Sequence, residues 1–155
     1  MSFSLRSKAR EFAMQMLFQW EMSPQDSKKL AAKFWRGAVA SEDVEVFADQ
    51  LFHATVRTVK DLDEVIEKHS QNWRADRIAA IDRAILRLAL HELAVGKTPA
   101  RTVMNEAVKL AKKYSSEDSA AFVNGILDAA VKARAKNSSH PPHSKAKTAT
   151  DSKPS

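Results

Sequence analysis

The sequence predicts an all-α fold, a bundle of about seven helices. Apolar residues recur at spacings of three and four along most of the chain, and no segment alternates with the period of a strand. Only three Gly and five Pro occur among the 155 residues, while Ala, Leu, Lys, Glu and Arg are common, a composition that favours helices. A chain of this length forms one ordinary domain with a single core.

The first two helices are expected over about residues 5–21 and 25–39, with Ser23-Pro24 separating them. Each has an apolar stripe at helical spacing, which should face the core. The stripes consist of Leu5, Ala9, Phe12, Ala13, Met16, Leu17 and Trp20 in the first helix and of Leu30, Phe34 and Trp35 in the second.

The next two helices are expected between residues 41 and 69, with a break near residues 59–61. Ser41 is a favourable N-cap residue. The acidic residues that follow it, Glu42 and Asp43, suit the positive end of the helix dipole.

Three further helices are expected at about residues 77–95, 103–114 and 116–136. The first of these is apolar nearly all round, so we expect it to be central and packed on several sides. Gly96 suits its C-terminal cap, and Pro99 begins the connection to the next helix.

Residues 137–155, rich in Ser, Lys, Pro and Thr, should form a disordered tail after a domain of residues 1–136. The net charge of +6 is concentrated near this end, with six basic residues and one acidic residue from Lys132 onward. Residues 1–131 hold nineteen basic and eighteen acidic residues, so the folded body is nearly neutral. Bulk charge is therefore weak evidence for nucleic-acid binding.

Local charge asymmetry is better evidence. Residues 1–36 carry seven basic and three acidic side chains, whereas residues 42–67 carry two basic and eight acidic ones. One end of the domain should therefore attract phosphate, and a neighbouring face should attract a basic partner.

No feature of the sequence indicates an enzyme, a cofactor or a metal. The absence of Cys excludes disulfides, thiolate metal sites and Cys nucleophiles, and no Gly-rich phosphate loop or nucleophile elbow is present. His140 and His143 lie in the tail, where nothing rigid would orient metal ligands. Asp82 and Glu92 lie on the apolar helix, and pairing with Arg explains such acids better than catalysis does.

We expect a cytoplasmic protein without a membrane segment. No apolar stretch approaches the roughly 20 residues that a bilayer requires. The opening segment MSFSLRSKAREF carries charges where a signal peptide needs an apolar segment.

The first helix offers a candidate surface for single-stranded RNA. If its apolar stripe faces the core, Phe18 lies on the opposite side beside Arg10, at about 100° per residue. An exposed ring near Arg6, Lys8 and Arg10 suits RNA, because cations hold phosphates while the ring stacks on a base. The alternative is that Phe18 packs against a second layer of helices.

A second candidate is the segment SEDSAAFVNGILD, residues 116–128. Gly125 destabilises the interior of a helix unless something approaches it closely. A tight helix crossing would explain Gly125, but it would not explain Phe122 if that ring is exposed.

Four segments resemble motifs of the NusB family of bacterial antitermination factors, in the order and spacing of that family. Three of them are consecutive and C-terminal: DRAILRLALHEL (82–93), VMNEAVKLAKKY (103–114) and EDSAAFVNGILD (117–128). The fourth resembles the basic opening helix of the family: RSKAREFAMQMLFQWE (6–21). The similarity spans about residues 5–135, although residues 22–70 share little beyond helical character.

The resemblance implies two small helical bundles set side by side. It also implies binding to the boxA element of ribosomal RNA leader transcripts, together with the ribosomal protein NusE, in an antitermination complex on RNA polymerase. Carried over by position, the RNA-binding residues would be Arg6, Lys8, Arg10, Phe18, Asp118 and Phe122, and the ribosomal partner would face Asp82 and Arg83. Members of the family often have three consecutive Arg where this chain has Arg6-Ser7-Lys8, a departure that bears on the strength of RNA binding rather than on its site.

Other interpretations remain open at this stage. NusB-like domains also occur in ribosomal RNA cytosine methyltransferases, but this chain lacks the Cys nucleophile that such an enzyme needs. A helical protein-interaction scaffold without intrinsic RNA specificity is the main alternative. The sequence also leaves open whether the free protein is a monomer or a homodimer.

Overall fold

A computed structural model of the chain describes residues 1–71 and 74–138. The described residues form seven α-helices and one short 3₁₀ helix, with no strand among them, which confirms the all-α prediction. The elements are α1 (Phe3–Met22), α2 (Ser27–Gly37), α3 (Glu42–Arg57), α4 (Val59–His69), η1 (Ala75–Arg77), α5 (Ala80–Val95), α6 (Ala100–Tyr114) and α7 (Glu117–Ser138).

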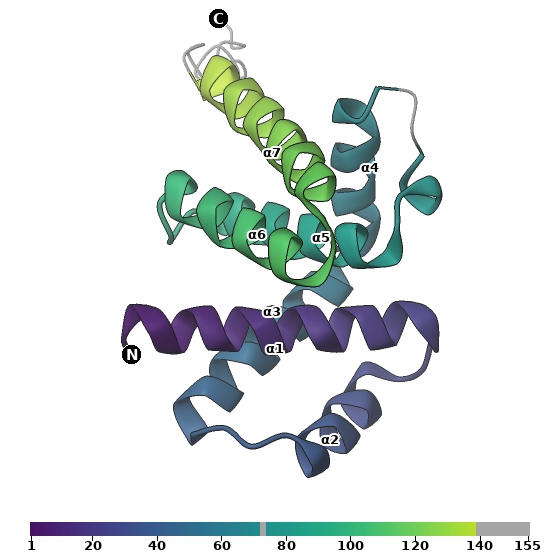
Figure 1. The fold of residues 1–155 in the computed structure, drawn as a ribbon, viewed down its shortest axis with the longest axis vertical. Helices are drawn as coiled ribbons and strands as arrows, with labels where there is room; N and C mark the ends of the chain where they lie inside the picture. The colour runs from purple at the N-terminus through teal and green to yellow at the C-terminus, as the bar shows by residue number, and fades with distance from the viewer. Residues whose placement is uncertain (72–73, 139–155) are drawn as a thin grey trace, which may run out of the picture.

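The helices form two groups on either side of α1 (Figure 1). Helices α2 and α3 lie on one side of α1, and helices α5, α6 and α7 lie on the other, with α4 beside α5. The main packing partners of α1 are α3 and α5, and those of α6 are α7 and α5. Helix α1 is therefore covered from two directions, a point that matters for the candidate site.

The helix ends follow the capping residues that the sequence predicts. Ser41 caps α3, where its hydroxyl accepts a hydrogen bond from the backbone N–H of Val44 at 3.4 Å. Gly96 closes α5 in the left-handed conformation, with φ of 77°. A single residue, Thr58, separates α3 from α4, close to the break expected at residues 59–61.

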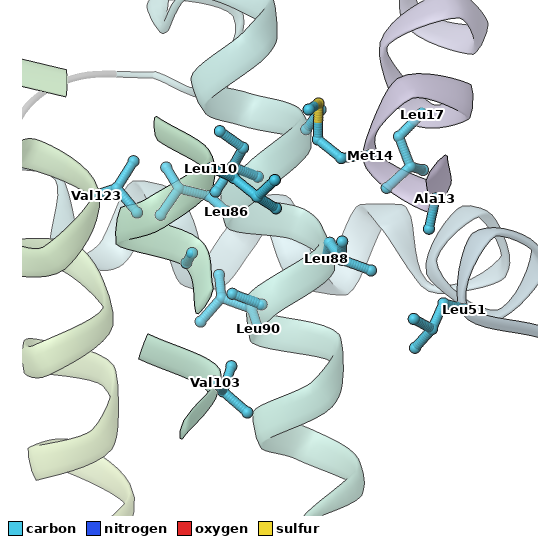
Figure 2. Close-up of a cluster of buried hydrophobic side chains, with 14 of the residues drawn as sticks. Ala13, Met14, Leu17, Leu51, Leu86, Leu88, Leu90, Val103, Leu110 and Val123 are labelled. Atoms are coloured by element: carbon cyan, nitrogen blue, oxygen red, sulfur yellow. The ribbon is translucent and has the colours of Figure 1, made fainter. Parts of the chain in front are cut away.

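Helix α5 lies at the centre of the core, as its apolar surface predicts. Every residue from 82 to 90 is buried. Its leucines lie together with side chains from four other helices (Figure 2), namely Ala13, Met14, Leu17, Leu51, Val103, Leu110 and Val123. The core is thus continuous from α1 and α3 through α5 to α6 and α7.

Helix α7 continues to Ser138, two residues beyond the predicted end at residue 136. The first two residues of the predicted tail, 137 and 138, therefore belong to α7, and the rest of that prediction lies outside the described residues. Among the residues that the structure covers, no helix is both long and apolar enough to cross a membrane.

Candidate nucleic-acid interface

Arg10 is buried, which corrects the prediction that it contacts RNA. Only 2% of the residue is exposed. Its Nε and Nη2 donate to the two carboxylate oxygens of Glu92 at 2.6 and 2.9 Å, and its Nη1 lies 3.7 Å from Glu106. The prediction assumed that only one stripe of α1 is buried, but α5 also covers the side of α1 that carries Arg10 and Met14. Arg10 is therefore an internal ion-pair residue.

The other two predicted basic residues of α1 are accessible. Arg6 is exposed, and the side chain of Lys8 is 54% exposed. The Lys8 ammonium lies 5.2 Å from the ring centroid of Phe12 and 3.9 Å from the carboxylate of Glu11. Ion pairs near the surface are weak, so the exposed Lys8 ammonium can exchange these contacts for phosphate.

Glu11 joins α1 to the end of α6. The Lys113 ammonium lies 2.7 Å from its carboxylate, and the Tyr114 hydroxyl donates to the same oxygen. Gln15, one turn further along α1, donates to the Tyr114 hydroxyl at 2.9 Å. Burial opposes ionisation of Glu11, but the hydrogen bonds from Lys113 and Tyr114 outweigh it and hold the pKa of the carboxyl below its usual range.

Lys113 and Tyr114 were not among the RNA-binding residues predicted from the sequence. The side chain of Lys113 is 61% exposed, so it adds a third accessible cation beside Arg6 and Lys8. The available signal was the position of both residues at the end of a Lys-rich amphipathic helix. Which element that end would face could not be read from the sequence.

Phe18 is half-buried, between the exposed ring and the packed ring that the two sequence-based interpretations expect. It packs against the hydrophobic core. It also lines an open depression of about 590 Å³ between α1 and α2, together with Gln15, Gln19, Lys33 and Phe34.

Asp118 and Phe122 lie at the start of α7 and line a hollow of about 340 Å³ with Arg77, Ile78, Ala79, Asp82 and Ser119. Asp118 is exposed and Phe122 is half-buried. One carboxylate oxygen of Asp82 accepts a hydrogen bond from the Ser119 hydroxyl at 2.9 Å. Its other oxygen, Oδ1, is buried and has no hydrogen-bond partner within the described part of the chain. Because a buried carboxylate oxygen without a donor is costly, this atom favours an incoming N–H or O–H group.

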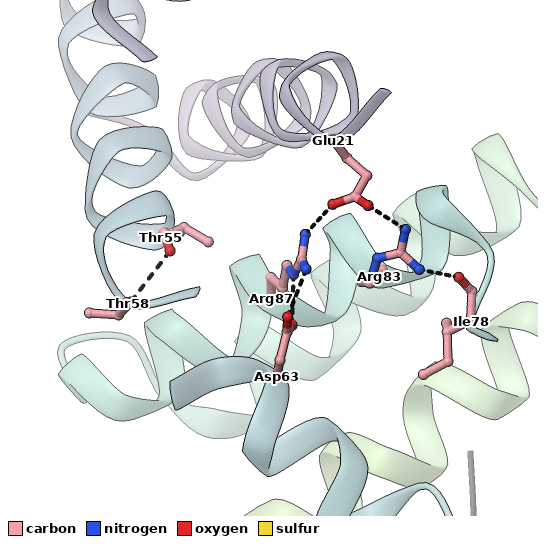
Figure 3. A network of polar contacts seen from close by, with 7 residues as sticks. All are labelled: Glu21, Thr55, Thr58, Asp63, Ile78, Arg83 and Arg87. Atoms are coloured by element: carbon pink, nitrogen blue, oxygen red, sulfur yellow. Dashed lines mark hydrogen bonds and ion pairs between the residues drawn. The ribbon is translucent and has the colours of Figure 1, made fainter. Parts of the chain in front are cut away.

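The two predicted partner-binding residues differ in their surroundings. Asp82 is only 6% exposed, although it lines the hollow. Arg83 is 7% exposed and donates inward, to Glu21 at 2.7 Å and to the carbonyl of Ile78 (Figure 3). Its prediction as a partner contact is therefore corrected, because this guanidinium ties α5 to the end of α1 and to the segment before α5.

Arg87 completes the same internal network. It donates to Glu21 at 2.8 Å and makes two bonds of 2.8 Å to Asp63, so that α1, α4 and α5 are joined through one side chain (Figure 3). Burial opposes ionisation of Glu21, but the hydrogen bonds from Arg87 and Arg83 outweigh it and lower the pKa of that carboxyl. The network reaches the hollow through the bond from Arg83 to the carbonyl of Ile78, a residue that lines it.

Three hydrogen bonds and one backbone step connect α1 to the hollow at the start of α7. From Gln15 of α1 the chain of contacts passes to Tyr114, which is followed by Ser115. The Ser115 hydroxyl donates to Ser119 at 2.7 Å, and Ser119 donates to Asp82 in the hollow. We call this surface the α1–α7 face and define it by Arg6, Lys8, Phe18, Lys113, Asp118 and Phe122.

The fold and this face define the class of the protein, an all-helical protein with accessible cations and half-buried aromatic rings on α1, α6 and α7. Over residues 1–71 and 74–138, no group of three or more His, Asp or Glu side chains could hold a metal ion. Comparison with known proteins then identifies the family. The model of the NusB family matches residues 7–132, and the chain belongs to that family.

Curated relatives agree with this assignment. The transcription antitermination protein NusB of Koribacter versatilis is 41% identical over 129 residues, which covers 82% of this chain and 88% of that protein. The protein of the same name from Anaeromyxobacter dehalogenans is 42% identical over 126 residues, covering 81% and 89%. Both relatives are transcription antitermination proteins that this chain matches over most of their length, so the chain is an antitermination factor and not an enzyme.

Solved structures share the fold. A crystal structure of the antitermination factors NusB and NusE in complex with double-stranded RNA matches with a TM-score of 0.77 and 32% identity, covering 85% of this chain and 99% of that chain. The solution structure of NusB from Aquifex aeolicus matches with a TM-score of 0.74 and 33% identity, covering 86% and 92%.

Proposed function

We propose that this chain binds the boxA element of ribosomal RNA leader transcripts together with ribosomal protein NusE. It does so in the cytoplasm, within the antitermination complex on RNA polymerase. The observation that carries the proposal is the α1–α7 face, where exposed cations adjoin half-buried aromatic rings. The similar NusB protein that was solved with NusE and double-stranded RNA supports both partners.

Each part of the face has a chemical role in this proposal. Arg6, Lys8 and Lys113 hold phosphates, because their charged ends are accessible to solvent. The rings of Phe18 and Phe122 stack on unpaired bases, which is how proteins read single-stranded RNA. The exposed carboxylate of Asp118 accepts hydrogen bonds from amino groups on base edges.

The protein partner is inferred from charge and from the hollow beside Asp82. With nineteen basic and eighteen acidic residues in 1–131, the chain offers few phosphate contacts, so alone it should bind RNA weakly at physiological salt. The acidic segment 42–67 suits a basic ribosomal protein. The unpaired Oδ1 of Asp82 suits a donor from that partner.

The hollow also gives a physical basis for coupling between the two ligands. Asp82 on the partner side and Phe122 on the RNA side line the same hollow. A partner that docks here would present its own RNA-binding groups already in place, which raises affinity without any additional interaction from this chain.

The test is an RNA titration with and without NusE at matched salt. We expect boxA RNA to bind the heterodimer at least tenfold more tightly than this chain alone, a coupling of about 1.4 kcal/mol or more. Asp82→Asn should reduce the coupling, whereas Asp128→Asn, which removes an acid paired with Lys132 on α7, should leave it unchanged. Equal RNA affinity with and without NusE would contradict a shared surface. Absence of RNA binding in both cases would favour the scaffold alternative.

A further inference from the structure

We infer that the first turn of α1 carries an additional stacking site for an unpaired RNA base, centred on Phe3. The inference rests on the proposed function, because the site extends the α1–α7 face toward the N-terminal end of α1. Phe3 is 58% exposed, whereas every other Phe, Trp and Tyr side chain in the described ranges is buried or half-buried.

The fold does not account for this ring. Phe3 belongs neither to the buried core nor to the partly buried residues that pack against it. Its notable neighbour is a cation, because the Lys109 ammonium lies 5.6 Å from the ring centroid. A largely exposed ring beside a cation is an arrangement that proteins use to stack on bases.

The surrounding charges identify nucleic acid as the ligand. Arg6 follows Phe3 by three residues and therefore lies on the same side of α1, one turn further along. Lys109 and Lys113 are one turn apart on α6 and face α1 at Phe3 and Glu11, respectively. Exposed ammonium groups thus accompany α1 from its first turn to Glu11, a rise of about 12 Å.

These cations remain accessible despite their local pairs. The side chain of Lys109 is 62% exposed although its ammonium lies 3.0 Å from Glu106, and that of Lys113 is 61% exposed. An RNA strand can therefore place phosphates along the α1–α6 boundary. Its bases would then reach Phe3 at one end, as they reach Phe122 at the other.

The test uses the full chain and boxA RNA oligonucleotides extended by several nucleotides on the 5′ or the 3′ side. Phe3→Ala should weaken binding of one extended oligonucleotide by about 5- to 150-fold, with little change in salt dependence, because stacking is lost and no phosphate contact is removed. Phe3→Trp should restore the affinity. Val39→Ala, at a 93% exposed apolar residue between α2 and α3, is the matched control and should have no effect.

A fluorescent base gives a direct readout. With 2-aminopurine placed at successive positions of the extension, one position should be quenched by the wild-type protein and by Phe3→Trp but not by Phe3→Ala. Unchanged affinity and quenching for Phe3→Ala, while Lys8→Ala weakens binding, would refute the stacking site and leave the proposed function intact. Loss of NusE binding rather than RNA binding in Phe3→Ala would equally refute it. If neither Phe3→Ala nor Lys8→Ala alters RNA binding, the stacking site and the assignment of Lys8 to the RNA surface both fail, whereas absence of RNA binding by the wild-type chain with and without NusE would contradict the proposed function itself.

Discussion

Replacing Arg10 by Ala removes the cation that lies between two buried carboxylates. The side chains of Glu92 and Glu106 are 7% and 5% exposed, so neither can recover full hydration after the substitution. Glu92 loses both of its hydrogen bonds to Arg10, at 2.6 and 2.9 Å, whereas Glu106 keeps an ion pair with Lys109 at 3.0 Å. The larger part of the cost therefore falls on Glu92.

Breaking a buried ion pair by removing one partner costs about 3–5 kcal/mol. The free energy of unfolding of a domain is about 5–15 kcal/mol, so the substitution removes a large share of it. For a domain of this size the loss corresponds to a fall in Tm of roughly 10–20 °C. Urea unfolding followed by far-ultraviolet circular dichroism measures the change directly.

A charge-free variant distinguishes loss of the pair from loss of packing. Arg10→Met combined with Glu92→Leu and Glu106→Gln should recover most of the stability, because no buried charge is then left without a partner. RNA affinity of the folded variant should keep its salt dependence, since Arg10 makes no surface contact. A stable Arg10→Ala protein whose salt slope falls by about 0.7 would refute the assignment and restore Arg10 as a phosphate contact.

The fold was predictable because its signals are local. Apolar spacing marks each helix, Ser41 and Gly96 mark two of the ends, and the nearly uniform apolar surface of α5 marks the central helix. These features depend on residues within a turn or two of each other. A single sequence contains that information in full.

The site was predictable only where it does not depend on distant partners. Arg6 and Lys8 are accessible, as a surface role requires, but Arg10 was misplaced because its partner Glu92 is 82 positions away. Lys113 was missed because Glu11, which shows that the end of α6 faces α1, is 102 positions away. The expected close approach to Gly125 is not present in this chain, because an added Cβ would have no neighbour within 4 Å.

Two further predictions concern Gly125 and Glu11. Gly125→Ala should stabilise the free chain by about 0.5–1 kcal/mol, because the space around this position in α7 has room for a methyl group. If Gly125→Ala weakens NusE binding and the control Gly37→Ala does not, the partner needs the space beside Gly125. Glu11→Gln tests whether this carboxylate competes with phosphate for Lys8 and Lys113. The lowered pKa of Glu11 keeps its carboxyl ionised at neutral pH, so the neutral amide of the variant should free both ammonium groups. RNA affinity should then rise severalfold at low salt. The salt slope should become steeper by about 0.7 for each additional phosphate that the freed ammonium groups bind. Asp128→Asn changes the net charge equally but removes an acid paired elsewhere, with Lys132, so it should alter RNA affinity much less. Weaker binding in Glu11→Gln would instead mean that Glu11 holds Lys113 in the orientation that RNA requires.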